Sequence, residues 1–124
     1  MIVNAQGDQY ILKTRLTLRR DGRYEGHGFG RGIAQLLDGI DRYGSLNMAA
    51  KEMEMAYSKA WRIIKQAEEE FGLQLISRDG AHGSTITEEG RAFYNHYLEM
   101  VAAAEKAAQD VFERYYGQKP TPAE

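Results

Sequence analysis

Apolar and polar side chains alternate near the start of the chain, between residues 10 and 19. The two sides of an extended backbone would carry Tyr10, Leu12, Leu16 and Leu18 on one side and Lys13, Arg15, Thr17 and Arg19 on the other. A period of two residues predicts a half-buried strand. The Asp21-Gly22 dipeptide favours a tight hairpin turn, so we expect a short return strand around residues 23–25.

From residue 32 onward the apolar spacing changes to that of helices. A first amphipathic helix, ending near Tyr43-Gly44, is predicted from the stripe Ile33, Leu36, Leu37 and Ile40. Ser45 is a favourable N-cap for a second helix, whose apolar positions are Leu46, Ala49, Ala50 and Met53. A third helix, from about Tyr57 to Gly72, has its stripe at Ala60, Ile63, Ile64, Ala67 and Phe71. Two short helices joined by about three residues are typical of a helix-turn-helix.

The remaining segments predict a wing and a long final helix. Residues 73–78 and 84–86 form two strands around a turn, and Thr87 is a favourable N-cap for a helix that continues to about Tyr116. Such a helix is ~42 Å long, and its two apolar seams predict packing against a second copy. The expected dimerisation residues are Phe93, Tyr94, Tyr97, Leu98, Val101, Ala104, Ala108, Val111 and Phe112.

These elements predict a mainly α fold with small β elements (α+β). We expect a winged helix-turn-helix with an N-terminal β-hairpin and a long C-terminal dimerisation helix. The predicted regions are a DNA-binding domain over residues 1–90, a dimerisation helix over 91–116 and a disordered tail over 117–124.

The composition narrows the class of protein. The chain has 124 residues, 43% of them hydrophobic and 27% charged, and no cysteine. This length suits one domain, and the lack of cysteine excludes a disulfide scaffold, thiolate metal sites and thiol catalysis. No apolar run approaches the ~20 residues of a membrane helix, and the first residues do not resemble a signal peptide. We therefore expect a cytoplasmic protein with no membrane partner.

The charge is slightly acidic overall but unevenly distributed. The formal net charge is −2, with +3 on residues 1–31, −3 on residues 32–91 and −2 on residues 92–124. Because the potential at a surface depends on local placement, a basic face is compatible with an acidic total.

Two sequence features could suggest dinucleotide binding or acid–base catalysis, but we interpret both as structural. The glycine-rich segment 26–32 fails the G-x-G-x-x-G dinucleotide pattern in both registers, so we interpret it as a flexible joint before the first helix. The acidic runs 68–70 and 88–89 lie on predicted exposed helix surface, and we interpret them as solvated faces rather than paired catalytic carboxylates.

The histidines and the single tryptophan do not indicate a site either. No metal-ligand spacing relates the three histidines, His27, His82 and His96. Trp61 is expected to pack against Tyr57, Ile64 or the N-terminal strand rather than to stack on bases. We expect no enzymatic activity, no metal, no cofactor and no small-molecule ligand.

Polar and cationic side chains gather at the starts of the second and third helices and in the wing. In a helix-turn-helix the start of the recognition helix meets base edges, while flanking groups hold phosphates. Arg62 could contact guanine through two hydrogen bonds. The predicted DNA-binding residues are Ser45, Asn47, Tyr57, Ser58, Lys59, Arg62, Lys65, Arg78 and His82. An ordinary solvated basic face is the alternative, because the same helix becomes acidic at residues 68–70.

Several short motifs together resemble one family. They are Gly44-Ser45-Leu46, Ala49-Ala50-Lys51, Met55-Ala56-Tyr57, Ala60-Trp61 and Ile86-Thr87-x-x-Gly90. Over about residues 12–98 the chain resembles the N-terminal DNA-binding domain of the molybdate-responsive repressor (ModE) family, a relative of the LysR-type winged helices. The family's glycine, serine and basic residue are replaced here by Glu54, Ala56 and Ser58.

The resemblance implies a homodimeric, operator-binding transcriptional regulator. The family's C-terminal oxyanion-binding domains are lacking in this sequence, so molybdate sensing is not expected. We predict sequence-specific binding to double-stranded DNA as a homodimer on a pseudopalindromic site, with residues 57–71 in the major groove. The alternative is a dimeric protein-interaction adaptor that keeps the winged-helix fold but binds DNA weakly or not at all.

Overall fold

The computed structural model describes residues 9–22, 26–78 and 83–121. The chain divides into two compact units, one of residues 16–97 and one that joins residues 1–15 to residues 98–124. The elements follow in the order α1 (Arg31–Tyr43), α2 (Leu46–Glu52), α3 (Tyr57–Phe71), β1 (Ile76–Arg78), β2 (Ser84–Ile86) and α4 (Glu88–Tyr116). None of the described helices is long and apolar enough to cross a membrane.

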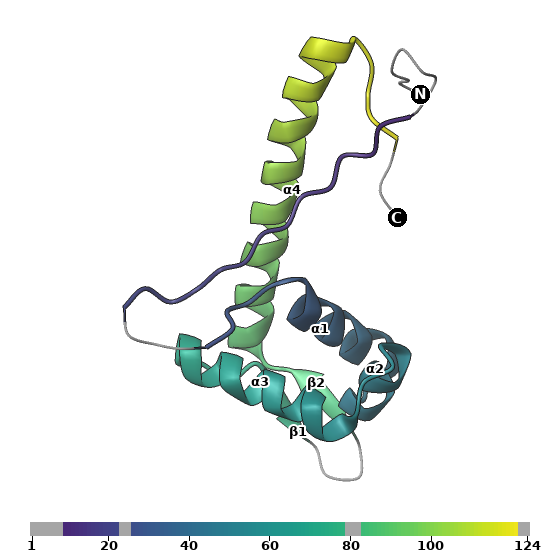
Figure 1. Ribbon diagram of the computed structural model, residues 1–124. Coiled ribbons are helices and arrows are strands. Elements are labelled where there is room, and N and C mark those ends of the chain that lie inside the picture. Colours follow the sequence, from purple (N-terminus) through teal and green to yellow (C-terminus); the bar gives the residue numbers. More distant parts are fainter. Residues whose placement is uncertain (1–8, 23–25, 79–82, 122–124) are drawn as a thin grey trace. The chain divides into compact units, whose positions relative to one another are not determined.

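The core of unit 16–97 lies among α1, α2, α3 and the small sheet (Figure 1). The predicted apolar stripe of α1 is buried, since Ile33, Leu36, Leu37 and Ile40 are all at most 6% exposed. The inward positions of the next two helices are buried as well, at Leu46, Ala49, Ala50, Ala60, Ile64 and Ala67. Three helices followed by an antiparallel hairpin confirm the mainly α winged helix-turn-helix fold.

The predicted helix ends are confirmed by their caps. Gly44 and Gly72 follow α1 and α3 in the left-handed conformation, with φ of 69° and 67°, which glycine adopts at little cost. The Ser45 hydroxyl at the start of α2 and the Thr87 hydroxyl at the start of α4 each accept the backbone N–H three residues later, at 3.2 and 2.9 Å. These are short-range features, so the sequence alone predicts them.

The crossing of α1 and α2 depends on a glycine inside α1. Gly39 is buried, and a Cβ placed there would lie 2.6 Å from the Cβ of Ala49 on α2. Two small residues therefore allow the two helices to approach closely. The sequence pattern did not indicate this contact between Gly39 and Ala49.

The wing is an antiparallel pair attached to the turn between α1 and α2. Strands β1 and β2 pair Ile76 with Ile86 and Arg78 with Ser84. The Ser84 N–H also donates to the Gly44 carbonyl at 2.9 Å, which fixes the second strand against that turn. Residues 79–82, including the predicted DNA-binding His82, lie outside the described residues.

The N-terminal segment has the predicted alternation but not the predicted strand. Exposed and half-buried residues alternate from residue 10 to residue 18, yet within the described residues the pairing is limited to single bridges. One antiparallel bridge joins Leu18 to Phe29 through two hydrogen bonds of 2.9 and 2.7 Å. The expected return strand at residues 23–25 lies outside the described residues. The described partner of Leu18 is Phe29, which lies further along the chain than that strand.

The middle of segment 26–32 is not the flexible joint that the sequence predicted. Gly28 and Phe29 are buried, and Phe29 is 0% exposed. Gly28 has φ of 78°, and a Cβ on it would lie 2.6 Å from the Leu18 carbonyl oxygen. The glycine is therefore needed for a close backbone approach, and Phe29 is a core residue.

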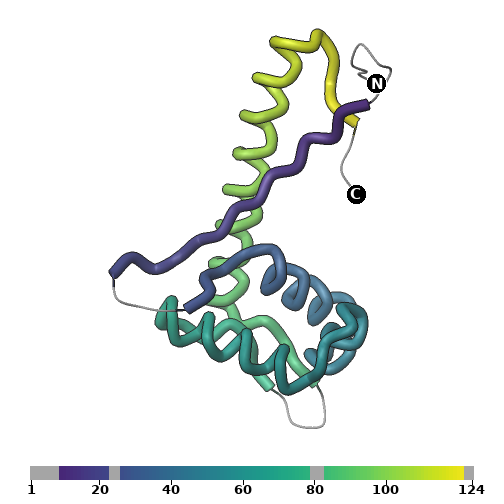
Figure 2. Tube along the Cα trace, in the orientation of Figure 1, coloured from purple at the N-terminus to yellow at the C-terminus, as the bar shows by residue number. Residues whose placement is uncertain are grey.

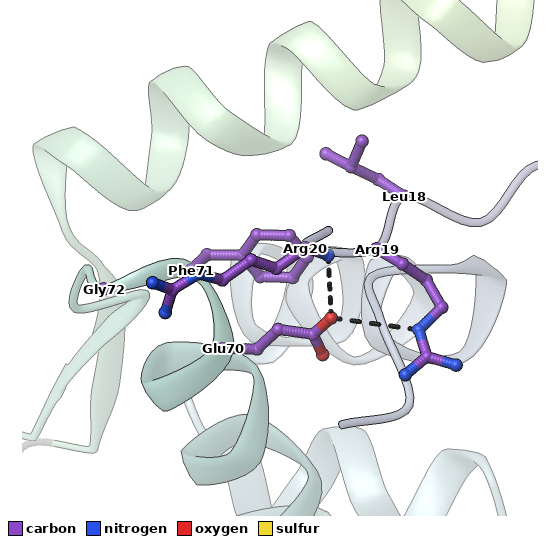
Figure 3. A pocket seen from close by; sticks show the side chains of 6 residues that line it. All are labelled: Leu18, Arg19, Arg20, Glu70, Phe71 and Gly72. Atoms are coloured by element: carbon purple, nitrogen blue, oxygen red, sulfur yellow. Dashed lines mark hydrogen bonds and ion pairs between the residues drawn. The ribbon is translucent and has the colours of Figure 1, made fainter. Parts of the chain in front are cut away.

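The interpretation of residues 68–70 as a solvated acidic face is also wrong for two of the three carboxylates. Glu70 is 1% exposed, and one of its oxygens accepts the Arg20 backbone N–H at 3.0 Å (Figure 3). The other oxygen accepts the Gly28 backbone N–H at 2.8 Å. Glu68 accepts the Leu75 N–H at 2.7 Å, at the entry to β1. A buried carboxylate is tolerated where hydrogen-bond donors satisfy its oxygens, so both residues fasten chain segments to α3.

The first turns of α4 belong to the core of unit 16–97. Tyr94 and Tyr97 are 6% and 4% exposed, and the Tyr97 hydroxyl donates to the Leu16 carbonyl at 2.7 Å. Phe93 packs against Phe29 and Phe71, with ring centroids 5.2 and 4.8 Å away. Their own unit thus buries Tyr94 and Tyr97, which removes these two from the predicted dimerisation surface, whereas Phe93 is half-buried. Burial raises the pKa of both tyrosine hydroxyls, which therefore stay protonated.

An ion pair joins α1 to the start of α4 within the same unit. Both terminal guanidinium nitrogens of Arg91 donate to the Asp41 carboxylate, at 2.7 and 2.5 Å. The hydrogen bond from Arg91 lowers the pKa of Asp41 below its ordinary value. Both side chains are about two-fifths exposed, so solvent screens the pair and its net contribution is small, about 0.5 kcal/mol.

The second unit pairs the N-terminal segment with the distal half of α4 (Figure 2). Tyr10 packs edge-on to Phe112 and Tyr116, with ring centroids 6.1 and 5.4 Å away. Ile11 and Thr121 form a parallel bridge, and the Thr121 N–H donates to the Tyr10 carbonyl at 3.0 Å. Thr121 lies in the tail that the sequence predicts to be disordered, and the N-terminal segment supplies it with a backbone partner that the sequence pattern did not indicate.

Candidate nucleic-acid interface

The turn before α3 sets where the helix starts. Glu54 has φ of 53°, the positive range that glycine adopts most easily, and it stands where the resembled family has glycine. The Met55 N–H donates to the Ala50 carbonyl at 2.9 Å and closes the turn. Ala56 is the N-cap of α3 and makes no side-chain cap hydrogen bond. The turn therefore keeps its shape without the residues that would favour it most.

Three cations of α3 extend into solvent on the side away from the core. Lys59, Arg62 and Lys65 are exposed, whereas Ala60 and Ile64 between them are buried. Lys65 forms an ion pair with Glu68 at 3.5 Å. Within the described part of the chain, neither Lys59 nor Arg62 forms an ion pair. Their charges are therefore available to an anionic partner.

The wing adds a fourth cation to this side of α3. The Arg78 guanidinium carbon lies 4.6 Å from the centroid of the Trp61 ring and 5.7 Å from that of Tyr57. Arg78 also donates to the Tyr57 hydroxyl. The Lys65 ammonium lies 4.8 Å from the Trp61 ring. We call Lys59, Arg62, Lys65 and Arg78 the α3 basic surface.

The structure gives Trp61 two charged neighbours that the sequence did not indicate. Packing against Tyr57, Ile64 or the N-terminal strand was expected, and the half-buried ring lies beneath Arg78 and Lys65. The spacing of Tyr57, Trp61 and Lys65 along the helix could have indicated a shared face. The contact with Arg78 could not be predicted, because it requires the hairpin to be positioned beside α3.

The remaining predicted residues lie at the helix starts. Ser58 is exposed and Tyr57 is half-buried at the first turn of α3. At the start of α2, Ser45 is occupied as a cap, and Asn47 is exposed beside it. Among the described residues, no group of three or more His, Asp or Glu side chains is arranged to hold a metal ion.

A helix-turn-helix followed by an antiparallel hairpin, with the second helix of the motif exposing cations, defines the winged helix-turn-helix class. Residues 34–91 match the family profile described as "Bacterial regulatory helix-turn-helix protein, lysR family". Over this region, a little under half of the chain, the protein is similar to LysR-type helix-turn-helix domains.

Individual relatives agree with this family. The chain is similar to the HTH-type transcriptional regulator CrgA of Neisseria meningitidis, serogroup C strain 8013, with 37% identity over 73 residues. The same identity and length are found for CrgA of the serogroup B strain MC58. The match covers 56% of this chain but only 24% of either relative, so the chain spans about a quarter of their length.

Solved structures share the fold. A crystal structure of the CbnR DNA-binding domain in complex with DNA is similar at a TM-score of 0.56 and 18% identity, covering 68% of this chain and 95% of that one. A BenM DNA-binding domain with benA site 1 DNA gives 0.55 and 22%, covering 70% and 97%. The resemblance to the molybdate-responsive repressor family is not supported, because the profile that residues 34–91 match is that of the lysR family and the similar curated proteins are CrgA regulators.

Proposed function

We propose that this chain binds double-stranded DNA in a sequence-dependent way and regulates transcription, with α3 in the major groove. The observation that carries the proposal is the α3 basic surface, in which Lys59 and Arg62 are exposed and make no ion pair among the described residues. The LysR-type match over residues 34–91 supports the same function. The CbnR and BenM domains of similar fold were crystallised with DNA, which adds support. The proposed role is regulatory rather than catalytic.

Each proposed contact follows from the position of its residue. Arg62 lies one turn into α3, where a guanidinium can donate two hydrogen bonds to a guanine edge. Lys59, Lys65 and Arg78 flank it and would contact phosphates. At the helix starts, Tyr57 and Ser58 on α3 and Ser45 and Asn47 on α2 would add hydrogen bonds to the backbone of DNA. In the wing, His82 is proposed to contact DNA as well.

We further propose that the chain acts as a homodimer on a pseudopalindromic site. The distal half of α4 exposes large apolar side chains that its own unit does not cover, among them Leu98, Met100, Val111 and Tyr115. Val101, Ala104, Ala108 and Phe112 are half-buried on the same helix segment and would contribute at the edges. Two-fold symmetry then sets half-site centres about 34 Å apart, or a multiple of that distance.

The first test measures whether the chain binds DNA and which DNA sequence it prefers. Sites are selected from random duplex DNA with the full 124-residue chain, and affinity for the selected site is then titrated against salt. We expect affinity to fall steeply as salt rises, because neutralised phosphates release counterions. A selection that enriches no sequence, together with no binding at low salt, would contradict the proposal and favour the dimeric adaptor.

The second test assigns the contact to α3. Arg62→Glu should weaken binding to the selected site at least about a hundredfold, since it removes a base contact and adds repulsion from phosphate. Arg31→Glu makes the same charge change at an exposed position on α1 and should have a much smaller effect. Equal losses in the two variants would mean that only total charge matters and that α3 is not the reading element.

A further inference from the structure

The contact between Trp61 and Arg78 connects two elements that are separate along the chain. Tyr57, Trp61 and Lys65 are spaced by four residues on α3, so they share one face of that helix. Arg78 is the last residue of β1 and reaches this face from the hairpin. The single tryptophan of the chain therefore lies where the wing meets the proposed recognition helix.

Two aromatic residues of α3 contact the Arg78 guanidinium. Its carbon lies 4.6 Å from the Trp61 ring centroid, within the range of a cation–π contact. One terminal nitrogen donates to the Tyr57 hydroxyl. A guanidinium has five N–H donors, and this arrangement leaves others for an anion. Within the described residues, Arg78 forms no ion pair that would occupy them.

The backbone of the hairpin is already fixed at both of its strands. Glu68 accepts the N–H groups of Leu75 and Ile76 as the chain enters β1. On β2, the Ser84 N–H donates to the Gly44 carbonyl. These backbone bonds do not restrain the long side chain of Arg78. Because this side chain is exposed, it would sample many rotamers without its contacts to Trp61 and Tyr57.

We propose that Trp61 is a positioning residue, which holds Arg78 so that the wing and α3 present their cations to one DNA site together. The inference rests on the proposed DNA binding and adds a role for Trp61, an uncharged residue, to that of the α3 basic surface. An arginine already held in its binding geometry loses less conformational freedom on contact with phosphate. Trp61 therefore strengthens binding without itself contacting DNA.

A double-mutant cycle on the selected duplex tests the positioning role. Arg78→Gln should weaken binding about tenfold, as loss of one cationic contact does. Trp61→Leu should weaken binding severalfold in the wild-type background and have no further effect when Arg78 is already glutamine. Trp61→Phe should restore most of the loss, because a phenyl ring still offers a face to the guanidinium. If the losses of affinity caused by Trp61→Leu and Arg78→Gln multiply in the double variant, the proposal is overturned.

Lys65 provides the matched control. Its ammonium also lies over the Trp61 ring, at 4.8 Å, but Lys65 is on α3 itself and is paired with Glu68. Its position therefore does not depend on Trp61, so the effects of Lys65→Gln and Trp61→Leu should multiply. Equal coupling of Trp61 to Lys65 and to Arg78 would show a general disturbance of α3 and overturn the specific role.

The free protein supplies a readout that does not depend on DNA. In the 124-residue chain all tryptophan fluorescence comes from Trp61, and acrylamide quenching should increase in Arg78→Gln because the ring loses its cover. Unchanged quenching would overturn the contact even if DNA binds. Increased quenching with no binding of wild-type protein to any duplex would instead reject the proposed function, and with it the role of the contact in DNA recognition.

Discussion

At the scale of single residues, the most informative side chain is a carboxylate in the core. Glu70 is 1% exposed and accepts two backbone N–H groups, from Arg20 and Gly28, which are far from it in sequence. The Arg19 guanidinium approaches it at 4.0 Å, from a side chain that is half exposed. Glu70 therefore ties the chain just after Leu18 and the chain just before Phe29 to the last turn of α3.

Replacing Glu70 by glutamine should destabilise the protein by about 1–3 kcal/mol. The amide keeps one acceptor oxygen but turns an N–H₂ group toward a backbone donor, so one buried N–H loses its partner. Glu69→Gln is the matched control, because Glu69 is exposed and its change should stay within about 0.5 kcal/mol. Urea denaturation followed by circular dichroism measures both. Equal stability of the two variants would contradict the proposed fastening role of Glu70.

At the scale of elements, the position of the helix-turn-helix depends on how closely α1 and α2 approach. The approach is set by Gly39 and Ala49, whose backbones leave no room for a further methyl group. Since α3 follows α2 after a short turn, a change in this crossing also changes how the wing and α3 meet. Small residues are therefore required here for geometry, although glycine in a helix interior costs about 1 kcal/mol relative to alanine.

Gly39→Ala should lower the free energy of unfolding by about 1–3 kcal/mol, because overpacking outweighs the gain in helix propensity. Gly32→Ala is the control in the same helix. Nothing lies within 4 Å of a Cβ at Gly32, so this change should stabilise by about 0.5 kcal/mol. Thermal unfolding of the two variants compares them directly. A stabilising Gly39→Ala would show that the helices can separate without cost.

At the scale of the whole molecule, the apolar surface of α4 indicates assembly. Large apolar side chains are exposed on its distal half, and Tyr115 is 74% exposed. The proximal half instead buries its tyrosines within its own unit. The single long helix thus has two roles along its length, one in its own fold and one proposed for a second copy.

Val111→Glu should dissociate the proposed dimer, raising its dissociation constant at least about tenfold, since an unpaired charge would be buried at the contact. Gln109→Glu introduces the same charge two residues away, on the other side of the helix, and should leave the mass unchanged. Sedimentation equilibrium across a range of protein concentrations reports the assembly state. A wild-type chain that remains monomeric at every concentration would reject the homodimer.

The local features of the fold are present in the amino-acid order. Helix positions, their glycine ends and the caps at Ser45 and Thr87 depend on residues a few positions apart, so periodicity and capping rules suffice. The exposure of Lys59 and Arg62 follows for the same reason, because one helix stripe that faces the core leaves the opposite side to solvent.

Contacts between distant segments were decided only by the tertiary structure. A glutamate in an acidic run is usually solvated, and Glu70 is buried only because two unpaired backbone N–H groups are brought to it. The same holds for Arg78 above Trp61, and for Tyr94 and Tyr97, whose apolar spacing is equally compatible with a partner chain. Periodicity specifies which face of an element is apolar, whereas the packing of the other elements decides what covers that face.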